Sequence, residues 1–182
     1  MKILFFFISL CISTACNAQI YPLRTFTEIP ENSYLKDTNN ELPAYEGTWK
    51  GIWNNKIIYI TFKKITNKYN ENLKYYKDNL IGKFKVLDNN GNVLFDNTNL
   101  PDSDPKIWGG KFRKVDDKYS LVYVDADLCN TSGNIIINFT DNSKTQLNWK
   151  LNLGSNMITT DCQYYNTGIP EALPKEIVLT KQ

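Results

Sequence analysis

The chain has 182 residues, a length that suits one well-buried domain better than two. Its 21 basic and 19 acidic residues nearly cancel, and no basic cluster stands out, which argues against a nucleic-acid partner. The sequence contains no histidine. That absence removes Ser-His-Asp and Cys-His nucleophile activation and histidine-ligated zinc. Carboxylate-pair hydrolysis, lysine bases and oxygen-ligated calcium remain.

Residues 1–18 have the pattern of a secretion signal, with an apolar run from Ile3 to Ile12 followed by small residues. The run is too short to span a bilayer. Its end allows two interpretations. Ser13-Thr14-Ala15-Cys16 resembles a bacterial lipobox, in which Cys16 is acylated and becomes the first mature residue, although serine stands where leucine is usual. The rival is cleavage after Ala18. We favour the lipoprotein, which would reach a membrane only through its lipid anchor.

Residues 19–45 follow as an extended N-terminal arm or linker. They carry prolines and the polar run Lys36–Glu41 but little hydrophobic periodicity. The remaining residues, 46–182, form the predicted β domain.

From Gly47 onward the chain repeats a short alternating apolar segment followed by a turn of Asn, Asp or Gly. The pattern predicts nine strands, at Thr48–Trp53, Lys56–Ile65, Ile81–Leu87, Asn92–Phe95, Lys106–Val115, Tyr119–Val124, Asn134–Phe139, Lys144–Leu151 and Lys175–Thr180. Residues Asn67–Asn79 allow a helical turn. The predicted fold is all-β, an antiparallel up-and-down meander of about eight or nine strands. Closure into a barrel would remove its exposed edges, and a β-sandwich is the alternative.

Alternation also predicts which side chains face the interior, because residues two apart in a strand share a face. The predicted interior or ligand-lining set is Trp49, Trp53, Ile58, Ile60, Phe62, Phe84, Leu147 and Trp149. Trp149 stands out because polar residues flank it on both sides. Trp49 has Gly47 and Gly51 two positions away on either side, and we expect these glycines to leave space for its indole.

Gly47-Thr48-Trp49 at the start of the first predicted barrel strand resembles the Gly-x-Trp signature of lipocalins and related calycins. The resemblance implies an eight-stranded barrel that holds a small apolar ligand, with Trp49 across its closed end. The other lipocalin signatures are missing, and a core tryptophan beside a tightly packed glycine is the competing interpretation. The whole chain also looks like a group of short, uncharacterised exported proteins of flavobacteria. That likeness covers the leader ending Cys-Asn-Ala-Gln, the stretch Tyr45–Gly51 and the paired late cysteines.

Cys129 and Cys162 are the only cysteines beyond the leader. Two cysteines in an oxidising compartment most simply form one disulfide, which would add about 3–4 kcal/mol by the chain-entropy estimate. A catalytic thiol ranks far behind, because no histidine can activate it.

Acidic residues gather in two predicted loops, one with Asp96, Asp102 and Asp104 and the other with Asp125 and Asp127. Neither carries the spaced ligand series of a calcium loop, so solvated turn residues are the preferred interpretation and no metal site is predicted. The pairs Tyr75-Tyr76 and Tyr164-Tyr165 could stack on sugars or touch a protein partner, although edge packing is preferred.

These observations predict a protein that is not an enzyme and needs no cofactor. The leading hypothesis is a lipid-tethered binding protein of the bacterial envelope that holds a small apolar ligand or a protein partner. The alternative is an inhibitor or immunity-type protein that blocks an envelope enzyme with its loops. An enzyme that uses carboxylates is kept as a third option. A hollow interior would favour the first, and a filled interior with protruding ordered loops the second.

Overall fold

The computed structural model describes residues 18–156 and 158–182. The secretion signal up to residue 17 and the acylation site expected at Cys16 lie outside these residues. The described part contains eleven β-strands and two short 3-10 turns, and none of its helices is long and apolar enough to cross a membrane. The predicted all-β class is confirmed.

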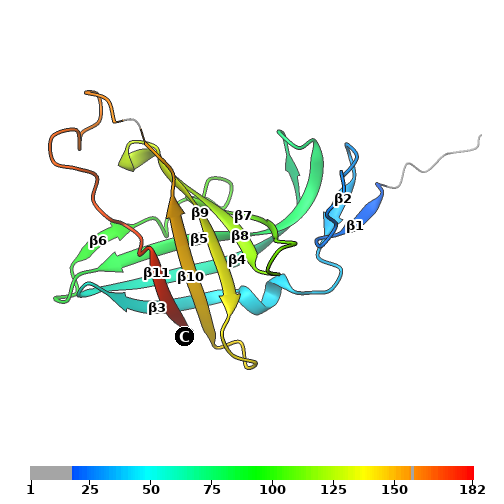
Figure 1. Ribbon diagram of the computed structural model, residues 1–182, viewed down its shortest axis with the longest axis horizontal. Helices are drawn as coiled ribbons and strands as arrows, with labels where there is room; N and C mark the ends of the chain where they lie inside the picture. The colour runs from blue at the N-terminus through cyan, green and yellow to red at the C-terminus, as the bar shows by residue number, and fades with distance from the viewer. Residues whose placement is uncertain (1–17, 157) are drawn as a thin grey trace, which may run out of the picture.

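Eight strands form one closed antiparallel barrel (Figure 1). The barrel strands are β3 (Gly47–Trp53), β4 (Lys56–Asn70), β5 (Tyr75–Leu87), β7 (Ile107–Phe112), β8 (Tyr119–Asp125), β9 (Thr131–Phe139), β10 (Gln146–Leu153) and β11 (Glu176–Lys181). Each pairs with the next, and β11 closes the ring on β3, with Thr180 opposite Lys50. Closure pairs every barrel strand on both sides, which removes the free edges of an open meander. The barrel is therefore confirmed over the sandwich.

Three strands lie outside the ring. β1 (Ile20–Pro22) pairs in parallel with β2 (Tyr34–Lys36), and β2 pairs in parallel with the first residues of β5. β6 (Val93–Asp96) pairs with the other end of β5. The long strand β5 therefore carries an added strand at each end as well as its two barrel neighbours.

The helical turn considered for Asn67–Asn79 is wrong. These residues extend the β4–β5 hairpin beyond the barrel, with a register shift between Ile65 and Lys68. The rings of Tyr69 and Tyr76 lie opposite each other, 5.0 Å apart between centroids. Aromatic cross-strand pairs stabilise a sheet, and such a pair outweighs a weak local helix preference.

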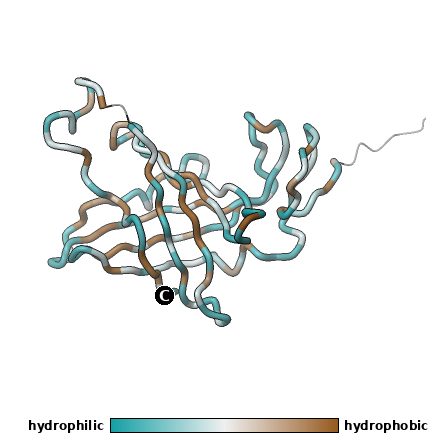
Figure 2. Tube along the Cα trace, viewed as in Figure 1, coloured by the Kyte–Doolittle hydropathy of each residue, from teal (hydrophilic) through white to brown (hydrophobic). Residues whose placement is uncertain are grey.

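The expected alternation appears along the barrel strands. In β10, Leu147, Trp149 and Leu151 are buried while Gln146, Asn148 and Lys150 are exposed. Figure 2 shows the same division, with hydrophobic positions on the barrel strands and hydrophilic ones in the turns. The inward side chains form one core cluster that fills the middle of the barrel.

One end of the barrel is closed by the 3-10 turn η1 (Leu42–Tyr45), directly before β3. The indole Nε1 of Trp49 donates a hydrogen bond to the carbonyl oxygen of Tyr45 at 2.8 Å. The Tyr45 ring stacks on Phe139, with 4.4 Å between centroids. Trp49 therefore joins the first barrel strand to the residues that plug this end.

The glycines beside Trp49 have a different role from the one expected. A Cβ at Gly51 would lie 2.5 Å from Cδ1 of Ile177 and 2.8 Å from Cδ2 of Leu179, so this glycine leaves room for side chains of β11. Gly47 has a φ of +110°, a backbone conformation that glycine adopts without steric cost. The expectation that both glycines make space for the indole is wrong.

Two buried carboxylates attach the N-terminal residues to the barrel. Asp78 on β5 accepts hydrogen bonds from the Tyr34 hydroxyl at 2.5 Å and from the backbone N–H of Asp37 at 3.0 Å. Asp37 accepts from the backbone N–H of Leu42 at 3.1 Å and from the Lys64 ammonium at 2.8 Å. Buried carboxylates are tolerated when their oxygens are hydrogen-bonded, so this network holds residues 34–42 on β4 and β5.

Candidate functional site

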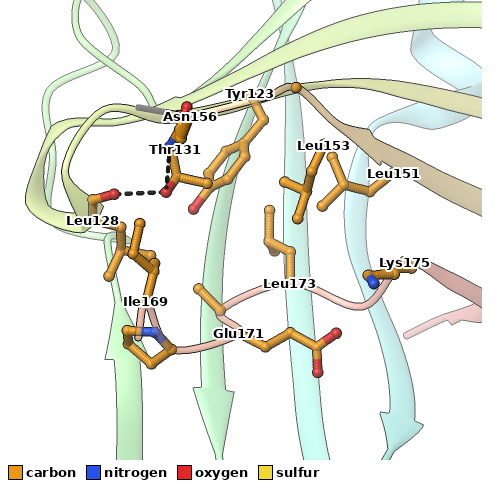
Figure 3. Close-up of a pocket in the computed structure, with 13 residues that line it drawn as sticks. Tyr123, Leu128, Thr131, Leu151, Leu153, Asn156, Ile169, Glu171, Leu173 and Lys175 are labelled. Atoms are coloured by element: carbon orange, nitrogen blue, oxygen red, sulfur yellow. Dashed lines mark hydrogen bonds between the residues drawn. The ribbon is translucent and has the colours of Figure 1, made fainter. Parts of the chain in front are cut away.

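The barrel end opposite η1 carries a pocket of about 330 Å³, which we call the mouth pocket (Figure 3). Its apolar lining residues are Tyr123, Leu128, Leu151, Leu153, Ile169, Pro170, Ala172 and Leu173. They come from β8, from the 3-10 turn that follows it, from β10 and from the residues that precede β11. A concave, mainly apolar pocket with a few polar groups is typical of small-molecule sites, and this volume lies near the lower end of their range.

The segment between β10 and β11 projects beyond this end of the barrel (Figure 1). We call its residues 158–175 the cap segment. The Cys129–Cys162 disulfide joins the cap segment to the turn η2 (Ala126–Leu128), which follows β8. Near β11, the Trp149 indole donates to the carbonyl oxygen of Pro174 at 2.9 Å, and Lys56 Nζ donates to the carbonyl oxygen of Glu171 at 3.2 Å. The cap segment is therefore fastened at both of its ends.

The polar groups of the mouth pocket lie at its edges. Thr131 Oγ1 donates to the carbonyl oxygen of Leu128 at 2.6 Å and accepts from Asn156 Nδ2 at 3.1 Å, as Figure 3 shows. Lys175 lies at another edge and is exposed. Because the Thr131 hydroxyl and the Asn156 amide already form hydrogen bonds within the protein, the apolar walls dominate what this pocket can hold.

A second pocket of about 230 Å³, which we call the side pocket, shares Leu128 with the mouth pocket. At its wall, Lys106 Nζ lies 2.5 Å from Asp125 Oδ1 and 2.7 Å from Asp127 Oδ2. Burial by itself lowers the pKa of Lys106, but its hydrogen bonds to the two carboxylates outweigh burial and raise this pKa above its ordinary value. Lys106 therefore keeps its positive charge at neutral pH and donates hydrogen bonds to both carboxylates.

The hydroxyl of Tyr123 connects the two pockets. It donates to Asp125 Oδ2 at 2.9 Å, and Tyr123 lines the mouth pocket while Asp125 lines the side pocket. Burial, together with the nearby Asp125 charge, raises the pKa of Tyr123 well above its usual range. The phenol therefore stays a donor, and it fixes the buried Asp125 carboxylate in place.

The structure places the sequence-predicted interior residues mainly in the filled middle of the barrel. Seven of them belong to the buried core cluster, namely Trp49, Ile58, Ile60, Phe62, Phe84, Leu147 and Trp149. Trp53 is half-buried, and its indole lies 3.4 Å from Glu171 Oε2 of the cap segment. None of the eight lines the mouth pocket, and Phe84 lines the side pocket.

Sequence reasoning missed most of the residues that form these pockets. The cap segment has no period-two pattern, so its apolar residues Ile169 and Leu173 gave no sign that they would cover a barrel end. The paired cysteines were the one signal, because a disulfide between Cys129 and Cys162 places the cap segment beside η2. The acidic turn at Asp125 and Asp127 was noted, but its lysine partner lies 19 and 21 residues earlier in the chain.

The other acidic and aromatic residues considered in the sequence lie at several places, and Asp96 is one of the side-pocket residues. Asp102 pairs with Lys63 and Lys83 on the outer face of β4 and β5, and Asp96 pairs with Lys85. The described residues contain no group of three or more acidic or cysteine side chains that could hold a metal ion. Tyr164 is half-buried and lines the side pocket, whereas Tyr165 is exposed.

Taken together, the geometry defines a closed eight-stranded β-barrel protein with a filled middle and a small capped pocket at one mouth. The chain belongs to a family of unknown function (DUF6705), whose model matches residues 1–182. No curated protein and no solved structure matches it.

Proposed function

We propose that this chain is a non-catalytic binding protein of the cell envelope that holds a small apolar ligand in its mouth pocket. The observation that carries the proposal is the apolar pocket of about 330 Å³ at the barrel end. The cap segment beside this pocket is held in place by the disulfide and by hydrogen bonds from two tryptophans. Transfer of an apolar ligand into such a pocket gains roughly 25 cal/mol for each Å² of apolar surface buried. No cofactor is needed for that role.

The test uses the fluorescent apolar probe N-phenyl-1-naphthylamine. We expect saturable binding to the disulfide-intact protein and a binding constant at least about tenfold weaker in Leu153→Trp, a loss of about 1.4 kcal/mol. Leu153 points into the mouth pocket (Figure 3), and it is 46% exposed, so a larger side chain fills the pocket without entering the barrel core.

The matched control is Val122→Trp, which adds the same ring to an exposed position on the outer face of β8. This variant should bind the probe like the unchanged protein. Equal binding by all three proteins would contradict the proposal, because the probe would then lie elsewhere.

The second candidate function is an inhibitor or immunity-type protein that acts through its loops. Its support is the filled middle of the barrel, together with Ile158 and Tyr165 on the projecting cap segment, which are 38% and 51% exposed. A photocrosslinking residue in place of Tyr165 would join such a protein to one envelope enzyme, and Ile158→Asp would abolish that product without changing probe binding. Loss of probe binding in Ile158→Asp would instead favour the ligand-binding role.

A further inference from the structure

Asn97, in the wall of the side pocket, has a buried hydrogen-bond donor without a partner in the part of the chain that the structure describes. Asn97 lines this pocket and is 5% exposed, and its Nδ2 has no hydrogen-bond partner among the described residues. The orientation of the amide is fixed by its other half. Asn97 Oδ1 accepts from the backbone N–H of Phe84 at 2.5 Å, and a flipped amide would place two donors face to face. Buried polar groups are almost always satisfied, so this donor indicates a missing acceptor.

The charges around Asn97 restrict what that acceptor can be. Asp96, Asp125 and Asp127 contribute three negative charges to the lining of the side pocket and Lys106 one positive charge, which leaves it negative overall. An anionic ligand is therefore disfavoured. A cation cannot satisfy an N–H donor, and Lys106 already lies between the two carboxylates. The remaining partner is a neutral oxygen of a hydroxyl, ether or carbonyl group.

Other walls of the side pocket favour a hydroxyl-bearing group over a plain carbonyl. The Asp127 side chain is 81% exposed and has carboxylate lone pairs that can accept from a ligand hydroxyl. Phe95 and Tyr164 are half-buried and present apolar ring surface beside these polar groups. Hydroxyls both accept and donate, so one polyhydroxyl group can use the Asn97 amide and the Asp127 carboxylate while its carbon face rests on an aromatic ring.

We propose that the side pocket binds the neutral, hydroxyl-bearing head group of the ligand whose apolar part lies in the mouth pocket. This inference rests on the proposed function and names its ligand class, a small amphiphile with a sugar or glycerol head. The two pockets share Leu128 as a lining residue, and the Tyr123–Asp125 hydrogen bond joins their walls.

The experiment compares eight-carbon amphiphiles that differ in their heads, each below its critical micelle concentration. We expect octyl β-D-glucoside or monooctanoylglycerol to bind about tenfold or more tightly than octanoate and octyltrimethylammonium. The stronger of the two neutral ligands identifies a sugar or a glycerol head. In Asn97→Asp the tighter-binding neutral ligand should lose about tenfold in affinity, the size expected for one hydrogen bond.

Asn97→Asp retains an oxygen for the backbone N–H of Phe84, and N-phenyl-1-naphthylamine binding shows that its mouth pocket is intact. Asn134→Asp, on an exposed position of β9, is the control for the added charge and should bind every amphiphile normally. Tyr164→Leu provides a second variant and should weaken neutral ligands more than the naphthylamine probe. The side-chain amide signal of Asn97 should also shift in the NMR spectrum when the neutral ligand binds.

Equal affinities for neutral and charged heads would overturn this inference, and so would an Asn97→Asp variant with unchanged affinities. In either case the naphthylamine probe would still respond to Leu153→Trp. The proposed function would fail separately, if that probe did not respond to Leu153→Trp.

Discussion

A buried lysine at the start of β5 makes the stability of the protein depend on pH. Lys77 is 8% exposed, its ammonium donates to the carbonyl oxygen of Gly110, and it has no ion pair among the described residues. Burial, together with the nearby Lys111 charge, lowers the pKa of Lys77 from 10.5 to about 8. The folded protein therefore binds this proton less tightly than the unfolded chain does.

The direction in which stability changes with pH depends on which state binds more protons at Lys77. Between pH 8 and pH 10.5 the unfolded chain holds more protons at this site, so the free energy of unfolding rises with pH. A shift of this size lowers the free energy of unfolding by about 3 kcal/mol below pH 7. Between pH 8 and 9.5 the free energy of unfolding rises again by about 1–2 kcal/mol. Above pH 10 the buried tyrosines oppose the trend. Burial raises the pKa of Tyr119, for example, so the unfolded chain loses that phenolic proton first.

The assay is urea unfolding at several values between pH 6 and 9.5. We expect the unchanged protein to gain about 1–2 kcal/mol from pH 8 to 9.5, and Lys77→Met to lose most of that rise. At pH 6 the variant should be more stable on the order of 1–2 kcal/mol, because the lost hydrogen bond to Gly110 offsets part of the gain. The control is Lys114→Met, at an exposed turn position, which should keep the original slope. An equal slope in the unchanged protein and Lys77→Met would refute the reasoning.

Three further predictions concern the disulfide, the barrel core and the expected acylation of Cys16. Replacing both Cys129 and Cys162 with serine should lower the free energy of unfolding by about 4 kcal/mol, since the bridge closes a loop of 33 residues, and a urea titration showing under 1 kcal/mol would contradict this. Trp149→Ala should cost about 3–5 kcal/mol, whereas Trp149→Phe should cost less because it retains an aromatic core ring and loses chiefly the hydrogen bond to Pro174. A fatty-acid analogue should label the unchanged protein in cells but not Cys16→Ser, and equal labelling of the two would contradict the lipoprotein prediction.

The strands of the barrel could be predicted because the pattern that specifies them is local. The period-two pattern of Gln146–Leu151 fixes which side chains share a face, and the Asn54-Asn55 pair between two alternating segments fixes a tight hairpin. Residues 67–79 show the limit of this reasoning. Their composition gave no clear period, and the cross-strand partners that make them a hairpin become neighbours only after the chain has turned.

The candidate site depended on contacts that no local pattern encodes. The orientation of the Asn97 amide is fixed by a hydrogen bond from the backbone of Phe84. The Asp125 carboxylate is held by hydrogen bonds from Lys106 and Tyr123. Local pattern alone was enough to predict a β-meander with an inward apolar face and a disulfide between the two late cysteines. The tertiary contacts were needed to show that β11 closes on β3, that the cap segment covers one mouth, and that Asn97 Nδ2 has no partner among the described residues. Strand alternation acts between neighbours in the chain, whereas closure joins residues more than a hundred positions apart, such as Lys50 and Thr180. The side pocket likewise joins residues as distant in the chain as Phe84 and Tyr164.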